Sequence, residues 1–260
     1  MDKAIVLMNP SASRQPALAA AIDYAIGTRL SLHLHGDVDA GQEHRGVMTS
    51  SFDEVSDHLF YYVEKGENKG LDVTYSINSS DSDQYINTSV SHSAFKMIFK
   101  DYQAASWSDQ LLHRDVHWML EAACPVSIVK GNYRWKDMRL LVDLENRSDD
   151  EFHEDLFKHE MAAAKHAEVL GADVHYLVNH SDSLHYPDRG RLVRHYNIDN
   201  AKLISRAGKR AEVVCETAKT LGSTMILSAA VNPEDRRHYK DEQLLHAIMN
   251  NCGADLTVIH

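Results

Sequence analysis

The chain has 260 residues, of which 43% are hydrophobic and 25% charged, and its formal net charge at pH 7 is −11. This length and hydrophobic content are typical of one large or two modest globular domains. The negative balance, without any block of like charges, argues against a nucleic acid or an anionic membrane as the main partner. No apolar run approaches the roughly 20 residues that span a bilayer, and the first residues lack a signal-peptide pattern. We therefore expect a cytoplasmic protein with no membrane span.

Segments with strand and helix patterns alternate through the first half of the chain. Short β-rich apolar runs predict strands, and apolar residues at helical spacing predict helices. The predicted strands are residues 3–8, 30–35, 71–77, 94–99 and 125–129. The predicted helices are residues 16–28, 50–64, 81–91 (a weak pattern) and 109–123.

The second half repeats this order. The predicted strands are residues 138–144, 174–178, 201–205, 225–229 and 256–259. The predicted helices are residues 149–170, 209–221 and 241–250, with at most a short helix at 190–196. Gly171 and Gly222 follow the first two of these helices and are expected to end them.

Residues 124–146 organise the chain, because they hold two apolar runs that recur at its ends. The run at 125–129 resembles the one that closes the chain at 256–259, and the run at 138–144 resembles the one that opens it at 3–8. The spacing of about 130 residues indicates a duplicated domain rather than a solenoid, whose repeats are much shorter. We predict an α/β fold with two tandem, doubly wound, five-stranded parallel-sheet domains at residues 1–131 and 137–260. A ligand site is expected at the carboxyl ends of the strands, near the switch in strand order.

Three motifs, taken in order, resemble the universal stress protein family, and most closely its tandem, E-type members. CPVSIVKG at residues 124–131 is similar to the closing strand of that family, and GSTMILSAA at 222–230 to its fourth strand. VDLENRSDDE at residues 142–151 is similar to the opening segment, and the resemblance puts Asp143 at the nucleotide-proximal acidic position. The resemblance implies Rossmann-like, adenine-nucleotide alpha-hydrolase-like domains. It also implies that residues 126–129 pair with residues 256–259, leaving a monomer or a dimer through another surface.

The chain departs from the family where ATP-binding members carry a glycine-rich segment after the fourth strand. Residues 100–116 and 229–245 contain no glycine, so neither segment offers the backbone N–H groups that cradle phosphates. Both segments carry carboxylates, and Asn9 stands where the family usually has Asp. We therefore predict no ATP, no other cofactor and no metal. A possible small-molecule ligand would bind in a cleft lined by polar residues at the strand ends, namely Asn9, Ser11, His35, Asp143, Asn179 and Ser228.

The remaining polar clusters have structural interpretations. His113 and His117 are four residues apart on a predicted helix and are expected to be partly exposed rather than metal-binding. His159, Glu160 and His166 are interpreted as a solvated helix face. Asp143 and Glu145 are expected to order a loop rather than to act as an acid/base pair.

A basic cluster, Arg236, Arg237 and Lys240, is predicted to be a solvated loop, with anion binding by its side chains as the alternative. The three cysteines have no metal-like spacing and no even pairing, which indicates free thiols. Cys124 is expected to be an inert packing residue and Cys215 to face the core, whereas Cys252, near a helix end, is a candidate for exposure.

Three functions are compatible with these features. The first is a non-catalytic stress-response protein that binds a small ligand or a protein partner, and the absence of a complete catalytic set favours it. The second is a nucleotide-binding sensor with the same fold, which would need a phosphate cradle. The third is a flavin-binding protein, which would need a phosphate loop after the first strand, where NPSASRQ at residues 9–15 is the only candidate.

Overall fold

The computed structural model of the protein describes residues 2–8, 12, 14–37, 52–78, 95–102, 116, 119–120, 122, 124–131, 135–145, 154–180, 184, 186–229 and 238–259. The chain divides into two compact units. Unit 1 comprises Met1–Ala104 with Ala122–Asn132, and unit 2 comprises Ala105–Glu121 with Tyr133–His260.

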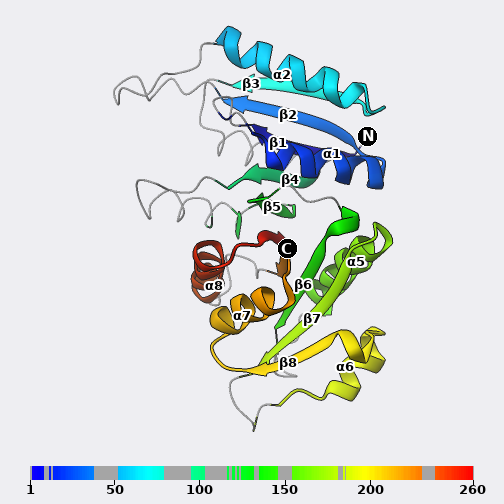
Figure 1. Cartoon of the computed structure of the whole chain (residues 1–260), viewed down its shortest axis with the longest axis vertical. Helices are drawn as coiled ribbons and strands as arrows, with labels where there is room; N and C mark the ends of the chain where they lie inside the picture. The colour runs from blue at the N-terminus through cyan, green and yellow to red at the C-terminus, as the bar shows by residue number, and fades with distance from the viewer. Residues whose placement is uncertain are drawn as a thin grey trace. The chain divides into compact units, whose positions relative to one another are not determined.

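Unit 1 is built on five parallel strands in the order β3-β2-β1-β4-β5 (Figure 1). Their bounds are β1 Lys3–Met8, β2 Ser31–Asp37, β3 Val73–Asn78, β4 Phe95–Asp101 and β5 Val126–Val129. The order reverses between β1 and β4, so the switch point of this unit lies where those two strands end.

Two helices cover one face of the unit 1 sheet, α1 (Pro16–Thr28) and α2 (Phe52–Glu67). Pro16 at the start of α1 has the φ angle that a first helical turn requires, and it lacks the N–H that would go unused there. The core combines alternate residues of β1, β2 and β4 with the inner faces of both helices, and its largest fully buried side chain is Phe99.

Unit 2 is also built on five parallel strands, in the order β10-β9-β6-β7-β8. Their bounds are β6 Arg139–Glu145, β7 Asp173–His180, β8 Leu203–Ala207, β9 Met225–Ala229 and β10 Asp255–Ile259. The order reverses between β6 and β9, which is the switch point of this unit.

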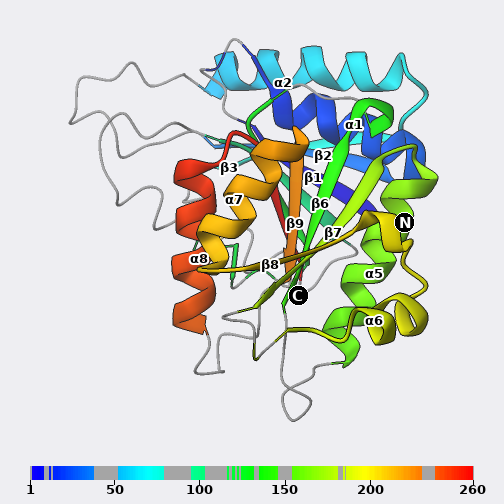
Figure 2. The same cartoon turned by 60° about the horizontal axis from the view of Figure 1, so that its bottom comes forward.

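Helices cover both faces of the unit 2 sheet, which Figure 2 shows nearly edge-on. Helices α5 (Glu154–Val169) and α6 (Arg189–Tyr196) lie on one face, and α7 (Arg210–Leu221) and α8 (His238–Asn251) lie on the other. Short 3₁₀ turns, η2 (Trp135–Asp137) and η5 (Asn200–Lys202), precede β6 and β8. The left-handed Gly222 (φ 65°) ends α7, and its N–H donates to two carbonyl groups of the last turn.

The sequence-based segments agree well with the observed elements. The bounds of β1, α1 and β9 match the predicted ranges, and most other strands begin or end within two residues of them. Residues 201–202 form η5 rather than the start of a strand, because Asp199 accepts a hydrogen bond from the Ala201 N–H and closes a turn there. The predicted helix at 81–91 and most of the one at 109–123 lie outside the described residues.

When the strands of the two units are matched end to end, residue 7 of β1 corresponds to residue 143 of β6. Leu7 pairs with His35 and Lys100, and Asp143 pairs with Leu177 and Ser228. Asn9, which the sequence comparison set against the acidic position of the family, lies outside the described residues, so that match stays a prediction.

Candidate functional site

The carboxyl edge of unit 2 brings together three of the predicted cleft residues. Asp143 on β6 and Ser228 on β9 are register partners, and both are 0% exposed. Asn179, next to last on β7, pairs with Glu145, two residues further along β6 than Asp143. Paired residues point to the same face of a sheet, so these side chains share the face that α7 and α8 cover.

An arginine that the sequence analysis did not identify completes this cluster. The Arg210 Nε donates to Asp143 Oδ2 at 3.0 Å, and its terminal nitrogen lies 2.9 Å from the same oxygen. The Ser228 hydroxyl donates to that oxygen at 3.4 Å. The side chain of Arg210 is only 19% exposed, so the charge pair is mostly removed from water. Removing one partner of such a pair leaves a buried charge and costs about 3–5 kcal/mol.

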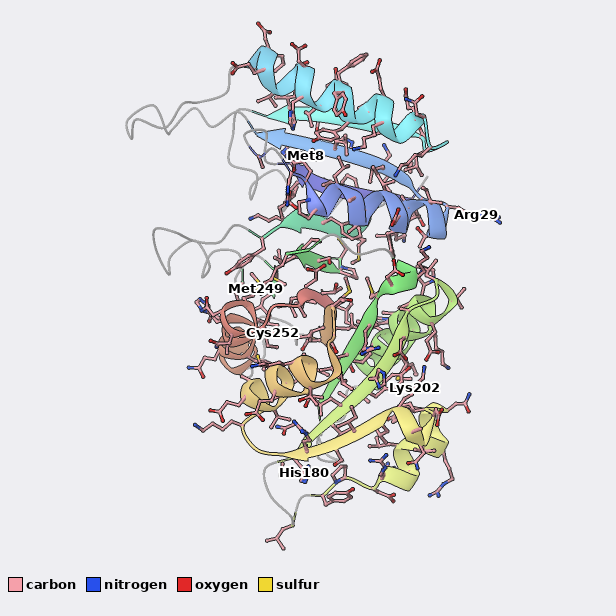
Figure 3. All side chains as sticks on the ribbon, viewed as in Figure 1. Met8, Arg29, His180, Lys202, Met249 and Cys252 are labelled. Atoms are coloured by element: carbon pink, nitrogen blue, oxygen red, sulfur yellow. The ribbon has the colours of Figure 1, made fainter. Side chains whose placement is uncertain are left out.

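The turn between β8 and α7 sets the position of Arg210. Gly208 has a φ of 139°, a conformation that other residues rarely adopt, and its N–H donates to the His180 carbonyl at 3.0 Å. The Asn179 amide donates to the Gly208 carbonyl at 3.1 Å. Figure 3 labels His180 at this end of β7. Arg210 follows two residues later as the first residue of α7.

A signal for Arg210 was present in the sequence. The segment Gly208-Lys209-Arg210 places two cations at the start of a predicted helix. A cation is unfavourable there, because the amino end of a helix carries a partial positive charge. An arginine at that position therefore needs a carboxylate nearby, and Asp143 supplies it.

The amide oxygen of Asn179 lacks a hydrogen-bond partner among the residues that the structure describes. Its Oδ1 is buried and has no hydrogen-bond partner among the described residues, while its nitrogen is held by Gly208. A buried acceptor without a partner is costly in an apolar setting, so it is a natural point for a ligand donor or an ordered water. The Asn179 Oδ1 is therefore a buried acceptor that the described residues leave without a donor.

Glu160 corrects the interpretation of His159, Glu160 and His166 as one solvated face. His159 and His166 are exposed as expected, but Glu160 is 4% exposed. Its carboxylate accepts the N–H of Ala229 at 3.1 Å and so joins α5 to the carboxyl end of β9. The sequence pattern failed here because the position is on the inner face of α5, where the carboxylate accepts a strand N–H instead of facing solvent.

In unit 1, His35 is part of a buried polar ladder on β2 and β3. Its Nδ1 lies 2.9 Å from the Ser76 hydroxyl, and it is 1% exposed. The two ring nitrogens of His33 contact Thr74 and Ser76, each at 2.9 Å. Burial, followed by the nearby charges of Lys3 and His35, lowers the pKa of His33 to about 4. The ladder is thus a set of buried polar groups that contact one another within the sheet.

The end of β4 holds a buried carboxyl group at the switch point of unit 1. Asp101 is 8% exposed, and its Oδ1 accepts the N–H of Ala17 at 2.6 Å in the first turn of α1. Burial raises the pKa of Asp101 to about 6, although the bond from Ala17 acts in the opposite direction. The N-cap residue of α1, Gln15, makes no side-chain cap bond, so Asp101 caps the helix in its place.

The other predicted site residues have less to contribute. Asn9, Ser11, the pair His113 and His117, and the side chains of the basic cluster at 236–240 lie outside the described residues. Burial raises the pKa of the Cys124 thiol to about 12, which fits an inert packing residue. Cys252 is buried at 9% exposure, so the expectation that it is exposed was wrong, and Cys215 is only partly buried.

No family model matches the chain, and no curated protein matches it. Several solved structures, by contrast, match the fold of the chain. A functionally unknown protein from Pseudomonas aeruginosa PAO1 has a TM-score of 0.77 at 16% identity, over 99% of this chain and 92% of that one. A candidate universal stress protein from Pseudomonas aeruginosa UCBPP-PA14 has a TM-score of 0.78 at 17% identity, with the same coverage. A universal stress protein from Archaeoglobus fulgidus DSM 4304 has a TM-score of 0.67 at 10% identity, over 98% and 95% of the two chains.

The chain has the universal stress protein fold. This confirms, at the level of fold, the resemblance that three short motifs indicated. It also confirms the α/β class with parallel, Rossmann-like sheets. Among the helices that the structure describes, none combines the length and the apolar character needed to cross a bilayer.

Proposed function

We propose that this protein is a tandem universal stress protein that acts in a stress response without catalysing a reaction. It binds a small ligand or a protein partner in the cytoplasm, and it does not bind ATP. Its two domains comprise residues 1–131 and 137–260.

The observation that carries this proposal is the state of the Asp143 carboxylate. Oδ2 already accepts hydrogen bonds from Arg210 and Ser228, and the residue is 0% exposed. A nucleotide that used Asp143 would have to displace an arginine from a buried charge pair, which costs several kcal/mol. The matching position in unit 1 is Leu7, which offers no polar group at all.

The absence of glycine at residues 100–116 and 229–245 supports the same proposal. Losing three charge-assisted hydrogen bonds, at about 1.5–3 kcal/mol each, weakens nucleotide binding by on the order of a thousandfold or more. The ligand that the unit 2 edge favours is instead a small molecule with an N–H or O–H group for the Asn179 Oδ1.

A thermal-shift screen with ATP, AMP, FMN and lipid-linked nucleotides tests the proposal, because a ligand that binds only the folded state raises its stability. We expect no shift with ATP. A ligand found by a wider screen should lose its shift in Asn179→Leu, but keep it in Asn250→Leu, a substitution on an exposed position of α8. A concentration-dependent ATP shift would favour the nucleotide-sensor alternative.

We also propose that the last strands of the two domains, residues 126–129 and 256–259, pair edge to edge within the chain. Such pairing would protect two apolar strand edges from aggregation. Ile128→Pro removes a backbone donor from β5 and should lower thermal stability and change the solution scattering profile. An unchanged profile and melting temperature in that variant would count against the pairing.

A further inference from the structure

Strand β3 is the last strand of unit 1 in the sheet order, and one of its edges has no neighbour among the strands that the structure describes (Figure 1). The Leu32 N–H donates to the Asp72 carbonyl at 2.9 Å, and this bond fixes which backbone groups of β3 point toward β2. Because successive residues of a strand direct these groups to alternate sides, three residues direct their N–H and C=O groups away from β2, namely Val73, Tyr75 and Ile77. Such a row of backbone groups is a template for pairing with a further strand.

The sequence of β3 lacks the residues by which proteins usually protect a strand edge. Charged side chains, proline and short length are common means of protection. The strand has the sequence VTYSIN over six residues, with no charged residue and no proline. By contrast β8, the last strand of unit 2 in the sheet order, has five residues and contains Arg206, which lies 4.0 Å from Glu216. The edge of β3 is therefore the better template of the two.

Helix α2 packs on β3 and bears a negative charge. It contacts both β2 and β3, and Gly66 brings it so close that a Cβ atom there would lie 2.7 Å from a Val73 methyl carbon. The helix has five acidic residues and one lysine, which is a net charge of −4, and all five acidic side chains are exposed. The lysine, Lys65, lies over the ring of Tyr62, 5.6 Å from its centre. A strand added to β3 would therefore extend the sheet beside an acidic helix.

Aromatic side chains are exposed on both elements. Tyr75 points to the same side of the sheet as Val73, the side that α2 covers, and it is nevertheless 43% exposed. On α2, Phe60 is 54% exposed and stands between Asp57 and Glu64 at helical spacing. A carboxylate beside an aromatic ring suits arginine, which pairs with the first and stacks on the second.

We propose that the edge of β3 binds an extended, arginine-rich segment of a partner protein as an additional strand. The segment pairs its backbone with the outward groups of β3, and its arginine side chains face Asp57 and Glu64 of α2. Opposite charges favour this cationic partner. They disfavour a second copy of β3, because antiparallel pairing would bring a second α2, with its own charge of −4, beside the first. This goes beyond the proposed function, because it assigns a partner surface to unit 1 rather than a ligand site to unit 2.

Fluorescence anisotropy of the full-length protein with a labelled peptide in which Arg and Val alternate tests this proposal. One control peptide has Glu in place of Arg. A second keeps the Arg side chains but has every backbone nitrogen methylated, so that it keeps the charge and cannot donate to a strand. In about 50 mM NaCl, where salt screens exposed charges only weakly, we expect the Arg peptide to bind and each control peptide to bind at least about tenfold more weakly.

Two variants of the protein separate backbone pairing from charge. Tyr75→Pro removes an N–H that points away from β2, so it spares the bonds between β2 and β3, and edge strands tolerate proline at such positions. Asp57→Lys/Glu64→Lys reverses two charges of α2. Each should weaken binding of the Arg peptide at least about tenfold. Glu168→Lys/Glu216→Lys, at exposed positions of unit 2, changes the net charge by the same amount and should bind like the wild type.

Circular dichroism checks that the variants fold, and if Tyr75→Pro does not, the methylated peptide still tests backbone pairing on the wild type. A methylated peptide that binds as tightly as the unmodified one would reduce the contact to charge attraction and overturn the proposal. An Arg peptide that does not bind, or an equal loss in the unit 2 control, would also overturn it. A wild type that sediments alone as a dimer, with Tyr75→Pro as a monomer, would assign the edge to a second copy instead.

Discussion

The two units of this protein share a strand order but differ at the edge where the ligands of such folds bind. In unit 2 the strand position nearest the switch point holds Asp143, buried and paired with Arg210. In unit 1 the matching position holds Leu7, an apolar residue at 9% exposure. The same backbone thus supports a buried charge pair in one unit and apolar packing in the other.

The junction between the fourth strand and the first helix differs in the same way. In unit 1 the strand provides the carboxylate, and Asp101 accepts an N–H of α1. In unit 2 the helix provides it, and Glu160 of α5 accepts the N–H of Ala229 on β9. Both units therefore join a strand end to a helix by a hydrogen bond from an N–H to a carboxylate. The carboxylate belongs to the strand in unit 1 and to the helix in unit 2. Apolar patterning determines where the elements lie, and polar pairing is then free to differ.

The largest predicted effect comes from breaking the buried charge pair of unit 2. Arg210→Met should lower the free energy of unfolding by about 3 kcal/mol or more, because Asp143 is left as a buried charge without its arginine. The matched control is Arg206→Met, whose side chain is 41% exposed and lies 4.0 Å from Glu216, and it should cost less than about 1 kcal/mol. Urea denaturation measures both variants.

The double variant Asp143→Leu/Arg210→Met sharpens the comparison, since it gives unit 2 the apolar residue that unit 1 already has. We expect it to recover most of the loss, because no charge remains buried. Equal costs for Arg210→Met and Arg206→Met would mean that the pair is solvated, and the contrast between the units would fail.

The second effect is pH-dependent and belongs to unit 1. Because burial raises the pKa of Asp101 from 3.8 to about 6, its protonated form stabilises the fold relative to its charged form. This stabilisation is fully present below pH 3.8 and is lost as the pH rises through 6. The change is about 3 kcal/mol. Asp101→Asn keeps an acceptor for the Ala17 N–H but cannot ionise. Its stability relative to the wild type should therefore rise between pH 4 and pH 8, and a constant difference would contradict the assignment.

The third effect concerns the junction of unit 2. Glu160→Ala leaves the buried Ala229 N–H without its acceptor and should cost about 1–3 kcal/mol. Glu160→Gln retains an acceptor oxygen and should cost distinctly less. Thermal denaturation compares the two. If both substitutions cost the same, the hydrogen bond to the strand is not what Glu160 contributes.

The smallest effect compares two histidines at the same strand position. His33 and His175 match when the strands are aligned, but His33 is buried among hydroxyl groups, whereas the His175 side chain is 20% exposed and contacts Asp173. His33→Ala should cost about 1–3 kcal/mol because buried hydroxyl groups lose partners, and His175→Ala less than about 1 kcal/mol. Chemical denaturation at neutral pH, where His33 is uncharged, measures the difference, and a larger cost for His175 would contradict it.

Much of the fold could be predicted from the sequence, because apolar periodicity and glycine placement are local signals. The apolar runs at residues 3–8 and 225–229 predicted strands with the observed bounds, and Gly222 predicted the end of α7. The site could be predicted only in part. Asp143, Asn179 and Ser228 follow from the rule that ligands bind at strand ends, but Arg210 pairs with a residue 67 positions away. The burial of Glu160 was missed for the same reason, since it depends on contact with a distant strand rather than on neighbouring residues.

Calorimetric titration of the full-length protein with Mg-ATP tests the central claim most directly. Since Arg210 holds Asp143 and neither strand-end segment contains a glycine, we expect no binding tighter than the millimolar range. Asp143→Asn, which keeps the shape of the side chain, should leave that result unchanged. A low-micromolar dissociation constant that Asp143→Asn abolishes would contradict the account and identify the unit 2 edge as a nucleotide site.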